Sequence, residues 1–314
     1  MKLSEGFELF YGSMKGVLSD QTVLAYKNVL PSLVDYMGDI ELDKVNLTEL
    51  REWRGRLVDK RERWGKGSTH PRDLQPLSPY TVHKYVRSAK RFFLWCIEEE
   101  LITRNPARRL EKPHLPKARA KGISPSDLAK MIQSAGQGPR PSKYTSTLDF
   151  SNRDKAIVMF LADTACRLAG VADLTFSDLD IDNQMAIVKE KGRGGWGKER
   201  SVFFTRATAD QLYLWLDDRA AYKVESVRVF GLETDGIYRM LQRVAKRAGV
   251  ETDWNPHSFR HAAIRAWLNN GMPIGEVAQL AGHSTVKVTS DVYGIVSDRT
   301  LQTDYNRYNW LCKA

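Results

Sequence analysis

A short basic segment with two prolines divides the chain into two parts. Residues 113–122 contain Pro113 and Pro116 among several basic side chains. Proline lacks a backbone N–H and clashes with the preceding helical turn, so this segment cannot continue a packed helix. We expect an interdomain linker here, between a first domain of residues 1–112 and a second domain of residues 123–314. A chain of 314 residues is long enough for two domains with separate cores.

Apolar periodicity predicts that the first domain is helical. After Ser78 and Pro79, a typical helix start, apolar side chains recur every three or four residues. This spacing predicts one buried face, formed by Val82, Tyr85, Val86, Ala89, Phe93 and Cys96. Further helices are expected over 20–37, kinked or split at Pro31, and over 47–61, with a long loop over 64–79.

The second domain is predicted to be mostly helical, with one small sheet. Two short runs, 185–190 and 201–204, have strand-like patterns and are joined by a glycine-rich turn, so they predict a hairpin. Ser124 and Pro125 indicate a capped helix start. Further helices are expected over 153–165, 207–218, 235–248, 258–269, 274–281 and 286–293. The expected fold class is therefore mainly α with a small antiparallel β-sheet.

The charge of the chain favours a polyanionic partner. Lys and Arg number 48 against 38 Asp and Glu, which gives a formal net charge of +10. This balance suits nucleic acid or an anionic surface, although a merely solubilising charge would give the same excess. In the helix after Ser78, the residues suited to contact a DNA backbone are Lys84, Arg87, Lys90 and Arg91. A solvated helix face is the alternative for these four side chains.

No segment of the sequence indicates a membrane or an oxidising compartment. No uninterrupted apolar run approaches the ~18 residues of a membrane span, and residues 1–11 lack the order of a signal peptide. Cys96, Cys166 and Cys312 are far apart and lack metal-ligand spacing, so we expect reduced thiols. We expect a cytoplasmic protein without membrane contact.

Three segments of the second domain contain side chains suited to phosphate chemistry. His257 and Arg260 lie one turn apart at an expected helix start, so both would face one ligand. Arg167 stands in a largely apolar stretch, where a guanidinium must be paired or must serve a buried anion. His283 follows a glycine turn, and Tyr293 ends the short helix after it. Taken singly, each of these residues also has an ordinary structural explanation.

Together and in this order, the segments resemble the tyrosine recombinase or phage integrase family. The matching pattern is Thr-x-x-Arg at 164–167, Lys-Gly at 191–192, His-x-x-Arg-His at 257–261, Leu-Ala-Gly-His-Ser at 280–284 and Thr-x-x-x-Tyr at 289–293. The resemblance covers nearly the whole chain. It implies a helical core-binding domain and a catalytic domain that form a C-shaped clamp on duplex DNA.

The resemblance implies a role for each matching residue. Arg167 and Arg260 correspond to the arginines that clamp the scissile phosphate, a task that suits the planar guanidinium. His257 corresponds to the histidine that helps to move the nucleophile's proton, and His283 to a hydrogen-bond donor to a phosphate oxygen. Tyr293 corresponds to the nucleophile that forms a 3′-phosphotyrosyl bond.

The hairpin supplies the remaining group. Lys191 corresponds to the lysine that protonates the leaving 5′ oxygen, and Lys198 is a second candidate for this role. Side chains would then stabilise the transition-state charge without a metal or other cofactor. The phosphotyrosyl bond keeps the energy needed for rejoining, so recombination through a Holliday junction would need no ATP.

The sequence departs from the family pattern at two positions. Gly170 stands three residues after Arg167, where the family usually has an acidic residue, so the orientation of Arg167 is in question. Asp173 lies one turn further on, and our hypothesis is that it substitutes for the missing acidic residue. Ala165 replaces a common glycine, a change expected to matter little.

Other functions compete with recombination. Residues 192–199 fit the Gly-x4-Gly-Lys part of a phosphate-binding loop, but Glu199 stands where Ser or Thr must bind Mg²⁺. His257 and His261 have the spacing of two zinc ligands, but the Glu of a zinc peptidase is replaced by Ser258, and His261 is expected to support the site indirectly. A DNA-binding regulator without catalysis, a related topoisomerase, and a chromosome-dimer resolvase in place of a mobile-element integrase are the remaining alternatives.

The resemblance also implies an assembly on a double-stranded DNA recombination site. We expect a monomer in solution and a homotetramer on DNA. An apolar stripe in the tail of residues 298–314 resembles the family's tail that docks into a neighbouring protomer. The alternative is a tail that packs on its own domain.

Overall fold

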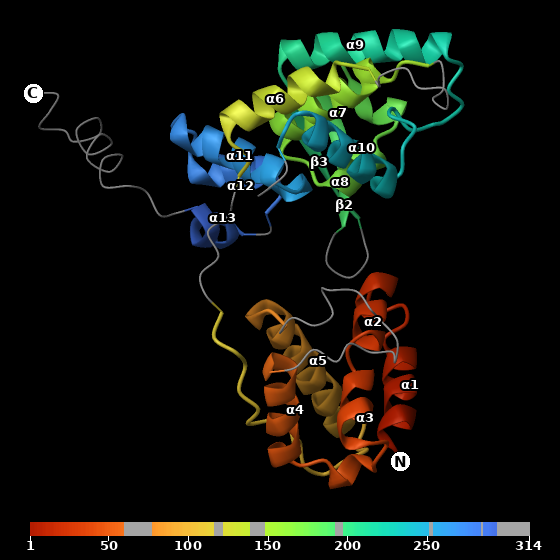
Figure 1. Cartoon of the computed structure of the whole chain (residues 1–314), viewed down its shortest axis with the longest axis vertical. Coiled ribbons are helices and arrows are strands. Elements are labelled where there is room, and N and C mark those ends of the chain that lie inside the picture. Colours follow the sequence, from red (N-terminus) through yellow and green to blue (C-terminus); the bar gives the residue numbers. More distant parts are fainter. Residues whose placement is uncertain are drawn as a thin grey trace, which may run out of the picture. The chain divides into compact units, whose positions relative to one another are not determined.

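The chain forms two compact units, which Figure 1 shows in a computed structural model. The structure describes residues 1–59, 77–115, 122–138, 148–191, 197–250, 254–283 and 285–293. One unit contains residues 1–118, and the other contains residues 119–192 and 197–314. Each unit has an apolar core of its own. The linker expected at 113–122 lies partly outside the described residues, and its limits stay a prediction.

The described part of the first unit is helical, as the sequence predicts. Its elements are α1 (Leu3–Ser13), α2 (Asp20–Lys27), α3 (Pro31–Met37), the 3₁₀ helix η1 (Leu42–Lys44), α4 (Leu47–Asp59) and α5 (Pro79–Glu98). The helix expected over 20–37 is split, because Pro31 opens α3, where its missing N–H costs nothing. Most of the loop expected over 64–79 lies outside the described residues.

Helix α5 lies at the centre of the first unit and carries its aromatic core. The Ser78 side chain accepts a hydrogen bond from the Thr81 N–H at 3.2 Å, which caps the helix start as predicted. The predicted apolar face is buried throughout. Phe92 meets Phe7 of α1 edge to face, with ring centroids 4.7 Å apart. This packing fixes α5 and therefore the direction of its basic face.

The second unit is mostly helical around one small sheet. Its elements are α6 (Pro125–Ala135), α7 (Ser151–Thr164), α8 (Leu168–Ala172), the 3₁₀ helix η3 (Phe176–Asp178), β1 (Leu179–Asp180), β2 (Met185–Lys191), β3 (Gly197–Phe203), α9 (Arg206–Ala221), α10 (Thr234–Arg247), α11 (Pro256–Asn269), α12 (Ile274–Ala281) and α13 (Val286–Tyr293). Helix α7 packs against α6, α9 and α11. The mainly helical class with a small sheet is confirmed, whereas α8 and β1 were missed from the sequence.

The sheet contains the predicted hairpin. Its strands are antiparallel in the order β1-β2-β3, and the hairpin register pairs Met185 with Phe203 and Lys191 with Gly197. Ala186 and Val188 of β2 and Val202 of β3 are buried against the helices, which gives the sheet one core face.

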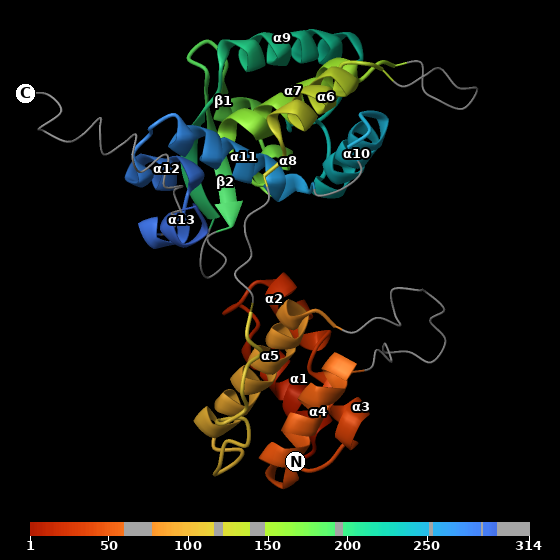
Figure 2. The ribbon, with the colours of Figure 1, turned by 60° about the vertical axis from the view of Figure 1, so that its left-hand side comes forward.

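A small separate cluster joins the last three helices of the described chain. Its buried members are Ala165, Ala263, Ile264, Val277 and Ala281, and Tyr293 packs against it. Figure 2 shows α11, α12 and α13 gathered together, and α12 also packs against β3. The cluster therefore brings the end of α7, the middle of α11 and the end of α13 to one place.

The structure bears on two sequence expectations, the lack of a membrane span and the state of the cysteines. None of the helices in the described ranges is long and apolar enough to cross a bilayer. Cys96 and Cys166 are buried and are not joined in a disulfide, and Cys312 lies outside the described residues.

Candidate active site

The start of α11 is fixed by a reciprocal cap. The Asn255 side chain accepts a hydrogen bond from the His257 N–H at 2.8 Å, and the Asn255 N–H donates to the Ser258 hydroxyl at 3.1 Å. Pro256 occupies the first helical position, where its fixed φ is favourable. This cap directs the first two turns of α11, so His257, Arg260 and His261 lie along one side of the helix.

Arg260 is buried and holds three elements together. Only 5% of its surface is exposed. Its Nη1 donates to the Ala165 carbonyl at 2.8 Å, and its Nη2 donates to the Ala281 carbonyl. A buried guanidinium needs such partners, because a buried charge without compensation destabilises a protein by about 3–5 kcal/mol. Arg260 therefore fixes the ends of α7 and α12 against α11.

Ala165 ends α7 in the left-handed conformation, with φ 52°. This conformation costs an L-residue ~1–2 kcal/mol relative to glycine. The methyl group is fully buried in the small cluster, which contributes ~0.8 kcal/mol. Burial of the methyl group offsets much of the backbone cost. This explains why alanine is tolerated at a position where the family that the chain resembles often has glycine.

Arg167 stands at the N-terminal boundary of α8, directly after the turn at Ala165. Asp173, expected as a substitute partner for Arg167, makes its ion pair with Arg228 at 3.1 Å. The Asp173 side chain is about half exposed, and Arg228 also pairs with Glu233. The structure thus gives Asp173 a different partner from the one that the sequence suggested.

His283 is oriented by the helix that follows it. Gly282 ends α12 with φ 69°, a left-handed conformation that glycine adopts without strain. The His283 N–H then donates to the Ala278 carbonyl at 2.9 Å. Its Nδ1 is hydrogen bonded to the buried Thr289 hydroxyl at 2.7 Å, so α13 fixes the plane of the imidazole ring. The role of Thr289 was not foreseen from the sequence.

Tyr293 lies at the end of α13 with its hydroxyl beside His261. The hydroxyl is hydrogen bonded to His261 Nδ1, and the two ring centroids are 5.6 Å apart. Burial raises the pKa of Tyr293 to about 12, although the positive charges of Arg260 and Arg265 oppose this rise. Burial also lowers the pKa of His261, and the nearby positive groups of α11 lower it further. Sequence spacing placed His261 near the site, but it did not identify this contact.

The two hairpin lysines lie on paired strands. Lys191 ends β2 opposite Gly197, and Lys198 of β3 is opposite Glu190. Their side chains and residues 192–196 lie outside what the structure describes. The chain that follows the Gly-x4-Gly-Lys match is a strand, whereas a phosphate-binding loop of that type must continue into a helix.

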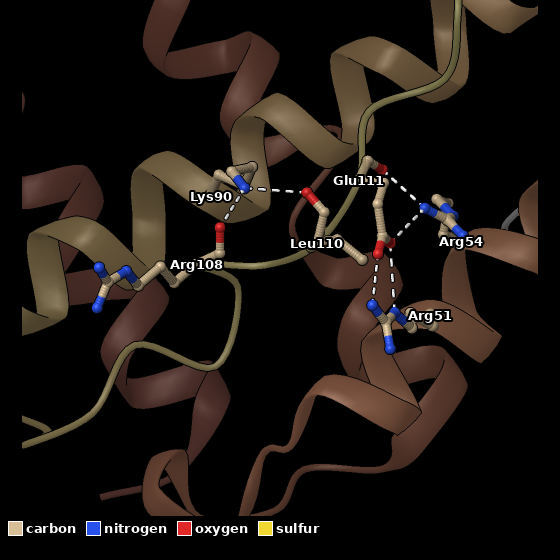
Figure 3. Close-up of polar contacts among 6 residues, drawn as sticks. All are labelled: Arg51, Arg54, Lys90, Arg108, Leu110 and Glu111. Carbon is tan, nitrogen blue, oxygen red and sulfur yellow. Dashed lines mark hydrogen bonds and ion pairs between the residues drawn. The ribbon is translucent and has the colours of Figure 1, made fainter.

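The four candidate DNA-binding residues of α5 differ in their surroundings. Lys84 and Arg87 are exposed, and Arg91 pairs with Glu98 on the same helix at 2.9 Å. The Lys90 Nζ donates to the Arg108 and Leu110 carbonyls, both at 2.9 Å (Figure 3). Contact with DNA stays a prediction for all four residues, but Lys90 already has two partners within its own unit.

Figure 3 also shows an ion-pair cluster at Glu111, next to the carbonyls that Lys90 holds. Arg51 pairs with the Glu111 carboxylate, and Arg54 donates to both the carboxylate at 3.0 Å and the Glu111 carbonyl at 2.8 Å. The hydrogen bond from Arg51 contributes most to lowering the pKa of Glu111 to about 2. These contacts attach the segment before the expected linker to α4.

Within the described residues, no group of three or more His, Cys, Asp or Glu side chains is arranged to bind a metal ion. The pair His257 and His261, considered as zinc ligands from the sequence, has no such third member in this part of the chain.

Comparisons with known proteins agree with the family that the sequence resembles. The phage integrase family model matches residues 142–299. Tyrosine recombinase XerC of Corynebacterium efficiens is 30% identical over 291 residues, which cover 90% of this chain and 84% of that protein. Tyrosine recombinase XerD of Listeria monocytogenes is 26% identical over 303 residues, which cover 93% of each chain.

Solved structures show the same fold. A Tn1549 transposon integrase in complex with circular intermediate DNA matches with a TM-score of 0.68 and 19% identity, over 97% of this chain and 99% of that one. XerH recombinase bound to a palindromic difH substrate matches with a TM-score of 0.70 and 16% identity, over 91% of this chain and 79% of that one. The chain belongs to the phage integrase family and is a site-specific tyrosine recombinase that breaks and rejoins DNA.

Proposed function

We propose that Tyr293 is the nucleophile of this recombinase. The proposal rests on the position of the Tyr293 hydroxyl, which lies between α11 and α13 and beside His261. The hydroxyl is also close enough to Arg260 for that positive charge to oppose the rise in its pKa caused by burial. Attack of the hydroxyl on a DNA phosphate would form a 3′-phosphotyrosyl bond and release a 5′ hydroxyl. Because this bond replaces the phosphodiester, rejoining requires no ATP.

We infer that Arg167, Arg260 and His283 bind the scissile phosphate. Guanidinium groups donate to phosphate oxygens in pairs and stay charged at working pH. The Thr289 hydroxyl can donate to Nδ1 of His283, which would leave the proton of the neutral ring on Nε2 as a donor to phosphate. Rigid donors of this kind stabilise the charge that develops in the transition state, and no metal takes part in the mechanism.

We propose that a lysine of the β2–β3 hairpin donates a proton to the leaving 5′ oxygen. Lys191 is the proposed donor to the 5′ oxygen, with Lys198 as the alternative. His257 is the residue that the family resemblance gives for handling the tyrosine proton. Its position one turn before Arg260 supports a place in the same site.

The proposed partner is a double-stranded DNA recombination site. Lys84 and Arg87 of α5 are exposed and suited to bind its backbone. We propose that the chain is a monomer in solution, that four copies assemble on DNA and exchange strands through a Holliday junction, and that the tail of residues 298–314 docks into a neighbouring copy. Deletion of this tail should impair synapsis more than DNA binding, and unaffected recombination would refute the docking.

The test is covalent trapping. A core site would first be recovered by selecting bound duplexes from a random library, and a nick would then be placed so that the 5′ product diffuses away. The full chain should form a denaturation-resistant protein–DNA adduct, and Tyr293→Phe should form none while binding DNA equally well. No adduct with the wild type would favour a DNA-binding regulator without catalysis.

A further inference from the structure

The hydrogen-bond partner of the Tyr293 hydroxyl is His261, one turn after the histidine that the family resemblance gives for proton handling. His257 lies on the first turn of α11 and is exposed, and its N–H serves the helix cap. His261 is part-buried, and its ring lies 5.6 Å from the Tyr293 ring, at an interplanar angle of 53°. The atom that must lose a proton on cleavage is therefore in contact with His261.

We propose that His261 accepts the proton of the Tyr293 hydroxyl during DNA cleavage and returns it during rejoining. The inference rests on the proposed nucleophile and assigns a catalytic residue to the same site. His261 contacts the reacting oxygen itself, whereas it was expected from the sequence only to support the site indirectly.

The protonation states suit this transfer. Burial, and the nearby His257, Arg265 and Arg260, lower the pKa of His261, so its ring is neutral at neutral pH. The buried phenol keeps its proton, so the hydroxyl donates and Nδ1 accepts. The geometry then requires the remaining ring proton to be on Nε2.

The proton leaves the Tyr293 hydroxyl while the bond from its oxygen to phosphorus forms. Free phenol is a far weaker acid than imidazolium, so the proton cannot leave before the attack begins. As the Tyr293 oxygen–phosphorus bond forms, the O–H bond breaks and the proton moves to Nδ1 of His261. The phosphorus–O5′ bond breaks at the same time, and the 5′ oxygen takes a proton from the hairpin lysine. The charge of the phosphate favours the imidazolium that results. Rejoining reverses each transfer.

The surrounding cluster explains why this contact forms. Tyr293 packs against the apolar cluster to which Ile264 of α11 and Val277 of α12 belong. Packing of Tyr293 against this cluster places its hydroxyl beside Nδ1 of His261. Ile264 is fully buried in this cluster and carries no polar atom on its side chain, so it offers a matched control on the same helix.

The experiment compares single-turnover cleavage of the nicked substrate by the full chain and six variants, of which Tyr293→Phe tests the nucleophile and His257→Gln tests the other histidine of α11. His261→Leu removes the acceptor, and His261→Asn places an amide oxygen near the position of Nδ1 but cannot take a proton. His261→Ala is assayed with and without added imidazole. Ile264→Val perturbs the packing only. DNA affinity and thermal unfolding of each variant establish that it folds and binds.

Proton acceptance predicts that His261→Leu and His261→Asn both cleave about 10²–10⁴ times more slowly at unchanged DNA affinity, the usual range for loss of a general base. Imidazole should partly restore His261→Ala, and Ile264→Val should remain near the wild type. Near-normal cleavage by His261→Asn would overturn proton acceptance and leave only a holding role. Unchanged cleavage by all His261 variants, with loss in His257→Gln, would return the role to His257. If the wild type forms no adduct, or Tyr293→Phe does, the proposed nucleophile itself fails.

Discussion

Lys90 and Lys84 lie on the same helix and offer a matched test of structural and DNA-binding roles. Both belong to the basic face that the sequence assigns to DNA. The Lys90 Nζ, however, holds the carbonyls of Arg108 and Leu110, whereas Lys84 is exposed. We predict that Lys90→Met lowers the stability of the first unit and leaves DNA binding intact, and that Lys84→Met does the opposite.

The magnitude follows from the two hydrogen bonds. A hydrogen bond to a charged group contributes ~1.5–3 kcal/mol when well buried. Lys90 is partly exposed, and its partial burial and the positive charge of Lys112 both lower its pKa. The two bonds together should therefore contribute about 1–2 kcal/mol to the free energy of unfolding. Methionine keeps the apolar stem of the side chain, which isolates the loss of the amino group. Lys84→Met should change stability by less than about 0.5 kcal/mol.

The assays are denaturant unfolding of the full chain and salt titration of DNA binding. Loss of one phosphate contact reduces the slope of log affinity against log salt by ~0.9. Lys84→Met should show this change, and Lys90→Met should show faster hydrogen exchange at residues 108–111 with an unchanged slope. A reduced slope and unchanged stability for Lys90→Met would refute the structural role of this residue.

Three further substitutions test the site and its supports. Asp173→Ala should leave the cleavage rate unchanged, because its partner is Arg228 and an exposed ion pair contributes about 1 kcal/mol or less; a large loss of cleavage would restore it as a partner of Arg167. Arg260→Lys should abolish adduct formation and lower the free energy of unfolding by about 1–3 kcal/mol, because Nη1 and Nη2 of the guanidinium each reach a different carbonyl, whereas lysine has a single nitrogen and lacks this planar fork. Glu111→Gln should speed hydrogen exchange at 110–112, and unchanged exchange would show that its ion pairs do not hold this segment.

Local signals in the sequence predicted most of the helices. Ser78 and Ser124 each cap a helix through a side-chain oxygen, as their positions before a proline predict, whereas the Asn255 cap of α11 was not predicted. Pro31 divides α2 from α3 for an equally local reason. Helix α1 was not predicted, and the short α8 and the two-residue β1 escaped prediction because neither is long enough to establish a hydrophobic period.

Contacts between distant segments could not be read in the same way. The spacing of His257 and His261 places both on one side of α11, but the packing of α13 decides which ring meets Tyr293. The partners of Lys90 depend likewise on where the chain after α5 returns. Basic residues on one helix face look alike in sequence, whereas their roles depend on such tertiary neighbours.

The most direct test of the central claim is to identify the residue that becomes joined to DNA. After trapping on the nicked core site, the adduct would be digested with a protease and a nuclease, and the modified peptide sequenced by mass spectrometry. We predict a nucleotide attached to the oxygen of Tyr293. A nucleotide on Tyr305, Tyr308 or any other residue would contradict Tyr293 as the nucleophile.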